Sequence, residues 1–208
     1  MKRFIIFFCM LVTVLSLIPA QERPDALLLY NQGKYEESVT VCLKELEEMP
    51  KNMDSYVVLG WGLLKLKRYN EVLDYTKKAF AISRYDARVI ESAGEANYYL
   101  GKNAEALKYF EEYASLAPTG PRIGDAYYLM GEIFIRVGEY NRADMSLTTA
   151  VSHSPSTSAW WARLGYAREM AGDYANASEA YDKALLLKPS LPDAVRGKER
   201  IRARLGNG

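Results

Sequence analysis

Glycine recurs along this chain at a nearly constant interval, and this recurrence constrains the fold more than any other feature of the sequence. Gly60, Gly94, Gly131 and Gly165 follow one another at spacings of 34, 37 and 34 residues. A period of this size is typical of chains built from similar supersecondary units, each of which buries its apolar face against its neighbours. The recurrence therefore favours a stacked array over a single globular core.

Each unit also contains a turn-forming cluster and a closing residue. The turns are expected at Gly33-Lys34-Tyr35, Lys67-Arg68-Tyr69, Gly101-Lys102-Asn103, Gly138-Glu139-Tyr140 and Gly172-Asp173-Tyr174. Mostly small residues follow each turn, at Ser38, Val72, Ala106, Ala143 and Ala177, and proline closes four of the five units, at Pro50, Pro118, Pro155 and Pro189. Glycine and proline interrupt helices at such places, so each unit is predicted to be a hairpin of two helices.

This pattern resembles the tetratricopeptide repeat. The last unit carries its signature nearly in full, at Trp161, Leu164-Gly165, Gly172-Asp173-Tyr174, Ala177, Tyr181, Ala184 and Pro189. The resemblance implies an all-α, right-handed superhelical solenoid of about five helical hairpins. We place the units at 19–52, 53–86, 87–120, 124–157 and 158–191, so that residues 21–191 form the repeat domain. Residues 192–208 are then a capping helix, from Pro192 to Leu205, and a tail.

A glycine inside a helix costs about 1 kcal/mol relative to alanine, so its presence needs an offsetting gain. We expect that gain to be close packing of the paired helix, with Gly165 opposite Ala177 and Gly131 opposite Ala143. A bulky replacement at Gly165 would then destabilise the array.

Three extra residues, Pro121-Arg122-Ile123, separate the third and fourth units. Two alternatives follow. The next helix starts one turn early with Pro121 at its first position, which suits proline, or the loop is longer and the superhelix bends between these units. We favour the first.

The first twenty residues have the composition of a secretory signal peptide. Lys2-Arg3 precede an apolar run from Phe4 to Ile18, and Ala20 stands before a polar segment. We expect cleavage after Ala20 and export to the periplasm or another extracytoplasmic space. The alternative is an uncleaved membrane anchor, although the run is shorter than the roughly 20 residues that span a bilayer. After cleavage Cys42 would be the single cysteine, and no disulfide could form within the chain.

Charge and polar residues argue against nucleic-acid binding and catalysis. The formal net charge of the whole chain is +1, and its single histidine, His153, stands at the predicted end of a helix. We find no metal-ligand spacing, no glycine-rich phosphate loop and no paired nucleophile and base in the sequence. We therefore expect a non-catalytic protein without a cofactor.

The resemblance also implies where a partner would bind, because the first helices of successive repeats line a concave groove. The positions carried over to this chain are Trp61, Glu91, Glu95, Tyr98, Tyr128, Glu132 and Tyr166. Aromatic side chains offer contact area at low entropic cost, and carboxylates favour cations. We expect a protein or peptide partner, as an extended or helical segment rich in apolar and basic residues.

One branch of the family binds chaperone carboxylates through a clamp of Lys, Asn and Arg. Here the corresponding places hold Arg23, Leu27, Val58, Arg88 and Ser92, which do not make that clamp. The chain is therefore interpreted as a protein-binding scaffold of the bacterial envelope. The alternatives are a self-associating structural protein of an envelope assembly and a membrane-anchored adaptor.

Overall fold

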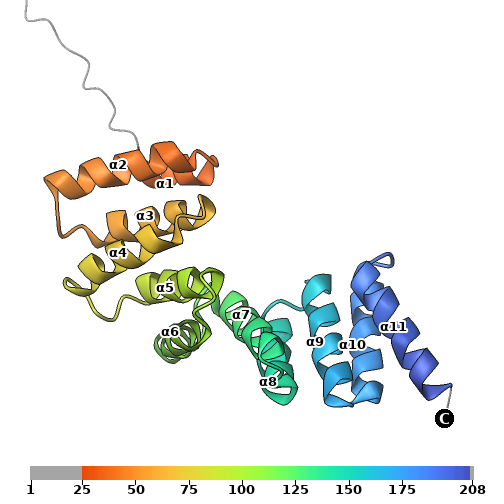
Figure 1. Ribbon diagram of the computed structural model, residues 1–208. Coiled ribbons are helices and arrows are strands. Elements are labelled where there is room, and N and C mark those ends of the chain that lie inside the picture. Colours follow the sequence, from red (N-terminus) through yellow and green to blue (C-terminus); the bar gives the residue numbers. More distant parts are fainter. Residues whose placement is uncertain (1–24, 207–208) are drawn as a thin grey trace, which may run out of the picture.

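The computed structural model describes residues 25–206, so the predicted leader lies outside the described residues. Within that range the chain is entirely helical and has no strand, which confirms the predicted all-α solenoid. Helices follow one another as a stack of antiparallel pairs (Figure 1). Their bounds are α1 Ala26–Asn31, α2 Tyr35–Glu48, α3 Met53–Lys65, α4 Tyr69–Phe80, α5 Ala87–Tyr99, α6 Asn103–Leu116, α7 Ile123–Arg136, α8 Tyr140–His153, α9 Ser158–Ala171, α10 Tyr174–Leu187 and α11 Pro192–Leu205.

Short polar side chains set the starts of several first helices. The Asn52 side chain accepts hydrogen bonds from two backbone amides at the start of α3, and Asp86 accepts one at the start of α5. These contacts satisfy amide groups that have no partner within the helix.

The predicted turns between paired helices adopt left-handed backbone conformations. Gly33, Gly101, Gly138 and Gly172 all have positive φ angles, the conformation in which glycine most often ends a helix. Lys67, which replaces glycine in the second unit, adopts the same conformation with φ of 59°. The sequence departure at this position therefore leaves the turn geometry unchanged, at the cost of strain that a side chain adds there.

Most of the repeated glycines lie next to a large side chain from the second helix of the same hairpin. A Cβ atom built on Gly165 would lie 2.7 Å from the Tyr181 ring, and one on Gly131 would lie 2.5 Å from Leu147. The close neighbour is therefore the larger residue of the second helix, not the alanine that we expected at position 177 or 143. The reason is geometric, because the large side chain reaches back across the interface while the alanine packs deeper.

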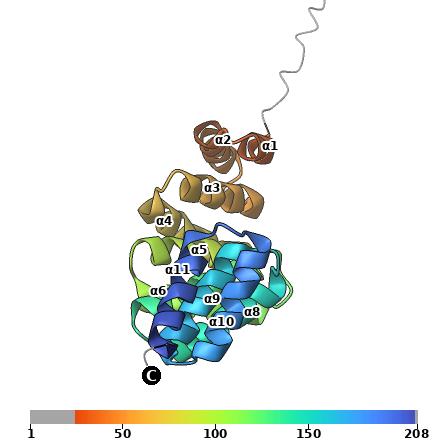
Figure 2. The same cartoon turned by 90° about the vertical axis from the view of Figure 1, so that its right-hand side faces the viewer.

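The predicted C-terminal capping helix is confirmed as α11, which lies against the last hairpin (Figure 2). Its buried residues are Ala194, Gly197 and Ile201. Gly197 also lies against the Tyr181 ring, because a Cβ built on it would lie 2.2 Å from that ring. Tyr181 is 1% exposed, so the cap closes the apolar end of the array around this side chain.

The preferred alternative for residues 121–123 is wrong. Helix α7 begins at Ile123, and Pro121 and Arg122 form a turn closed by a 3.1 Å hydrogen bond from the Ile123 amide to the Gly120 carbonyl. The turn is held in place because the Arg122 amide donates to the Tyr113 hydroxyl at 3.3 Å. The longer loop is therefore correct, and the stack changes direction after α6 (Figure 1).

Candidate functional site

The seven residues predicted to line the groove all lie on the first helices of their hairpins. Trp61 is on α3, and Glu91, Glu95 and Tyr98 are on α5; Tyr128 and Glu132 are on α7, and Tyr166 is on α9. Glu91 is buried, and the other six are partly buried. They form a row along the array in which each helix contributes one to three members, so they do not converge on a single point.

The two carboxylates on α5 are already paired within the chain. Arg122 donates from Nε to Glu91 Oε1 and from Nη2 to Glu95 Oε2, each at 2.8 Å. Burial raises the pKa of the Glu91 carboxyl above its ordinary value, whereas the adjacent Arg122 guanidinium acts in the opposite direction. The turn at residues 120–123 thus places the Arg122 guanidinium where it compensates the negative charges of Glu91 and Glu95.

The same pairing recurs further along the array. Arg163 donates from Nη2 to Glu132 Oε2 at 2.9 Å, and Arg200 bonds both oxygens of Glu169 at 2.7 Å. The partners in these pairs, like Arg122 and Glu91, are 31 residues apart in sequence. These glutamates are therefore each paired with an arginine further along the chain, and the row is less acidic than its count of glutamates suggests.

The aromatic members of the row also have partners. The Arg136 guanidinium lies 4.7 Å from the centre of the Tyr98 ring, and that of Arg163 lies 5.2 Å from Tyr166. Tyr128 stacks on Trp160 with ring centres 5.0 Å apart. Burial raises the pKa of the Tyr128 hydroxyl to about 12. These rings are held rigidly while part of each stays accessible, as is typical of contact residues at interfaces.

Trp61 differs from these residues because it borders a cavity of about 530 Å³ at the N-terminal end of the row. Its ring packs against Tyr30 at 5.9 Å, and its indole Nε1–H is buried without a hydrogen-bond partner in the described chain. The other lining residues are Asp25, Ala26, Leu27, Glu45, Asn52, Asp54, Ser55, Val57, Val58 and Arg88.

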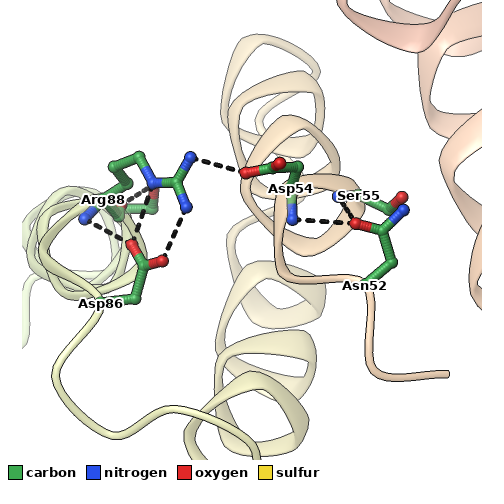
Figure 3. A network of polar contacts seen from close by, with 6 residues as sticks. Asn52, Asp54, Ser55, Asp86 and Arg88 are labelled. Atoms are coloured by element: carbon green, nitrogen blue, oxygen red, sulfur yellow. Dashed lines mark hydrogen bonds and ion pairs between the residues drawn. The ribbon is translucent and has the colours of Figure 1, made fainter.

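Three of the charged cavity residues, Asp25, Glu45 and Asp54, are carboxylates, and one, Arg88, is a cation. Figure 3 shows Arg88 between two carboxylates. It donates to Asp54 at 2.8 Å and to both oxygens of Asp86, which holds the guanidinium from the other side. Asp25 and Glu45 were not recognised from the sequence, since one precedes a short helix and the other lies on a second helix.

Residues 25–206 contain no group of three or more His, Cys, Asp or Glu side chains placed to hold a metal ion. No helix in the same range is long and apolar enough to cross a membrane.

Comparison with known proteins agrees with the geometry. Residues 128–194 match the family model described as tetratricopeptide repeat. The TPR repeat-containing protein PA0015 of Pseudomonas aeruginosa is 34% identical over 70 residues, which are 34% of this chain and 67% of that protein. The chain belongs to the tetratricopeptide repeat family. Members of this family are in general non-catalytic scaffolds for protein–protein interaction.

Solved structures share the fold of this tetratricopeptide repeat protein at low sequence identity. A structure of Pseudomonas aeruginosa pilF superposes with a TM-score of 0.75 at 15% identity, covering 87% of this chain and 81% of pilF. YrrB, a TPR protein with an unusual peptide-binding site, superposes with a TM-score of 0.67 at 20% identity, covering 84% and 88%. A MamA structure superposes with a TM-score of 0.69 at 20% identity, covering 80% of this chain and 95% of MamA.

Proposed function

We propose that this tetratricopeptide repeat protein is an exported, non-catalytic scaffold that binds an extended or helical segment of another protein along its first helices. The observation that carries the proposal is the row of rigid, partly accessible rings of Trp61, Tyr98, Tyr128 and Tyr166, which ends at the cavity beside Trp61. A segment lying along this row would bury apolar side chains against rings that lose little entropy on binding. The peptide-binding site of YrrB, a protein of the same fold, supports the same use of the array.

The ion pairs within the chain reduce the preference that the middle of the groove can have for basic residues of a partner. Glu91, Glu95 and Glu132 are each paired with an arginine, so a partner's cations gain little there. We therefore assign recognition along α5 and α7 to the aromatic rings. A preference for basic residues in the partner depends on the cavity at the N-terminal end, where the described lining residues include three carboxylates and one cation.

Location in the envelope rests on the N-terminal sequence alone. Lys2-Arg3, the apolar run to Ile18 and Ala20 support export with removal of the leader. Intact-mass analysis of protein from its native host tests this part of the proposal. A chain that still begins at Met1 and sediments with membranes would favour the anchored adaptor.

The binding proposal is tested on a partner isolated with the full chain as bait. Trp61→Ala should weaken binding by about 2 kcal/mol or more, because a ring at the end of the row would lose its contact area. Tyr85→Ala is the matched control, since Tyr85 is 71% exposed and lies between α4 and α5, outside the row. Both variants should remain folded. If both bind like the parent, the functional surface lies outside the groove; if the captured partner is the chain itself and its mass rises with concentration, the protein is a self-associating one.

A further inference from the structure

We propose that the cavity between α1 and α3 binds a lysine or arginine side chain of the partner segment. This inference rests on the proposed function and deepens it, because it assigns the basic residue of the partner to one place in the groove. The first unit contributes to this cavity through α1, a helix of six residues, from which Ala26 and Leu27 line it.

Charge supports a cationic occupant. Among the described lining residues Arg88 is the single cation, against Asp25, Glu45 and Asp54, so that these four side chains together carry a formal charge of −2. Arg88 is moreover shared with Asp86, to which it makes two further hydrogen bonds from its side chain. Each of Glu91, Glu95 and Glu132 has an arginine within hydrogen-bond distance. Among the described residues of the groove, the uncompensated negative charge therefore lies at the cavity.

The carboxylates retain acceptor capacity. Asp25 uses Oδ1 for the Leu28 amide, and Asp54 uses Oδ1 for Arg88. A carboxylate has two oxygens and about four acceptor positions, so each aspartate can accept a further donor. The Asp54 side chain is 80% exposed and therefore accessible to one.

The cavity walls suit the aliphatic stem of a long basic side chain. Val57, Val58 and Leu27 line it together with the Trp61 ring, and such stems gain by lying on apolar surface while the charged group stays near water and carboxylates. A cation next to an indole ring gains further attraction from the ring. The Nε1–H of Trp61 is buried without a hydrogen-bond partner in the described chain, which is an unusual state for a buried donor.

A set of blocked pentapeptides tests the proposal without the natural partner. The peptides have the sequence Ala-Leu-X-Leu-Ala, with X as lysine, arginine, norleucine or glutamate. Norleucine keeps the stem of lysine and lacks its charge. Each peptide is titrated into the ¹⁵N-labelled full chain, and the side-chain indole signals of its three tryptophans are followed. Trp61→Phe identifies the Trp61 signal. The lysine and arginine peptides should shift this signal and bind about tenfold more tightly than the norleucine peptide, with a preference that falls as salt rises.

The double variant Asp25→Asn/Asp54→Asn removes the charge and keeps the acceptors that cap α1 and hold Arg88. It should reduce the preference for lysine over norleucine to less than about twofold. Glu111→Gln/Glu179→Gln is the control, because it removes the same charge from exposed positions on α6 and α10. It should leave the preference unchanged.

Equal binding of lysine and norleucine peptides, or a preference that survives in the aspartate variant, would overturn the assignment of a cation to this cavity. So would shifts confined to the other two tryptophans, or no binding at all, which would indicate that a second copy or another segment of this chain fills the cavity. The proposed function fails separately, when Trp61→Ala leaves binding of the captured partner unchanged.

Discussion

At the scale of single residues, most of the repeated glycines leave room for a large side chain of a neighbouring helix. The four glycines that define the repeat differ in how close that side chain lies. A Cβ on Gly94, Gly131 or Gly165 would lie within 2.8 Å of a large side chain, whereas one on Gly60 would lie 3.7 Å from Ser92. Packing therefore requires glycine at positions 94, 131 and 165, but not at position 60.

The substitution Gly165→Ala should therefore destabilise the protein by about 1–3 kcal/mol, since the buried Tyr181 ring is also in close contact with Gly197 and has little room to move. Gly60→Ala, at the equivalent place in the second unit, should be neutral or stabilise by up to about 1 kcal/mol, because alanine is the better helix former. Chemical denaturation of both variants measures the difference. Equal effects would show that the Tyr181 contact does not distinguish the two sites.

At the scale of elements, α11 is joined to α9 by charge as well as by apolar contact. Burial alone would raise the pKa of Glu169, but hydrogen bonds from Arg200 and Tyr181 lower it below its ordinary value. A carboxyl whose pKa is lowered on folding contributes stability at pH values above its unfolded pKa, and this contribution is lost as the pH falls through the folded value.

Glu169→Gln should accordingly cost about 2 kcal/mol at pH 7, where the charged hydrogen bonds are present. The difference from the parent should shrink as the pH falls below about 4.3, the ordinary pKa of glutamate. Unfolding free energies from pH 7 to pH 3 check this. Glu139→Gln removes a carboxylate that is paired with exposed Arg142, and its smaller effect is the comparison. A cost for Glu169→Gln that is independent of pH would mean that the pair does not stabilise the cap.

At the scale of the whole molecule, Arg122 joins the two halves of the array. It precedes α7 and pairs with two glutamates on α5, at the place where the stack changes direction (Figure 1). Glu91 is 2% exposed at its side chain, so its charge would be stranded in the interior if the arginine were lost.

Replacing Arg122 by methionine should cost about 3 kcal/mol, the lower end of the range for a broken buried pair, because the Arg122 side chain is 37% exposed and water can partly replace it. Adding Glu91→Gln to this variant should recover part of the loss, because the neutral amide costs less to bury. Urea denaturation of the single and double variants measures both effects. A loss below about 1 kcal/mol, or no recovery, would show that the pair does not hold the two halves together.

What the sequence by itself determined is the local order of the chain. Turn glycines and helix-capping side chains act within one unit, and the spacing of about 34 residues shows where each unit recurs. The hairpins, the α11 cap and the helical positions of Trp61, Tyr98 and Tyr128 could therefore be predicted from the sequence. Residues such as Lys67 follow the local pattern even where the residue type departs from it.

Only the tertiary structure decided which charges remain free. The glutamates on α5 and α7 are paired with arginines 27 or 31 residues further along, and these contacts depend on how successive hairpins rotate against each other. That rotation is set by packing over many residues, and the turn at Pro121 and Arg122 alters it. A sequence can therefore show that carboxylates lie along a groove, but their compensation, and the cavity where it is incomplete, follow from side chains that meet across units.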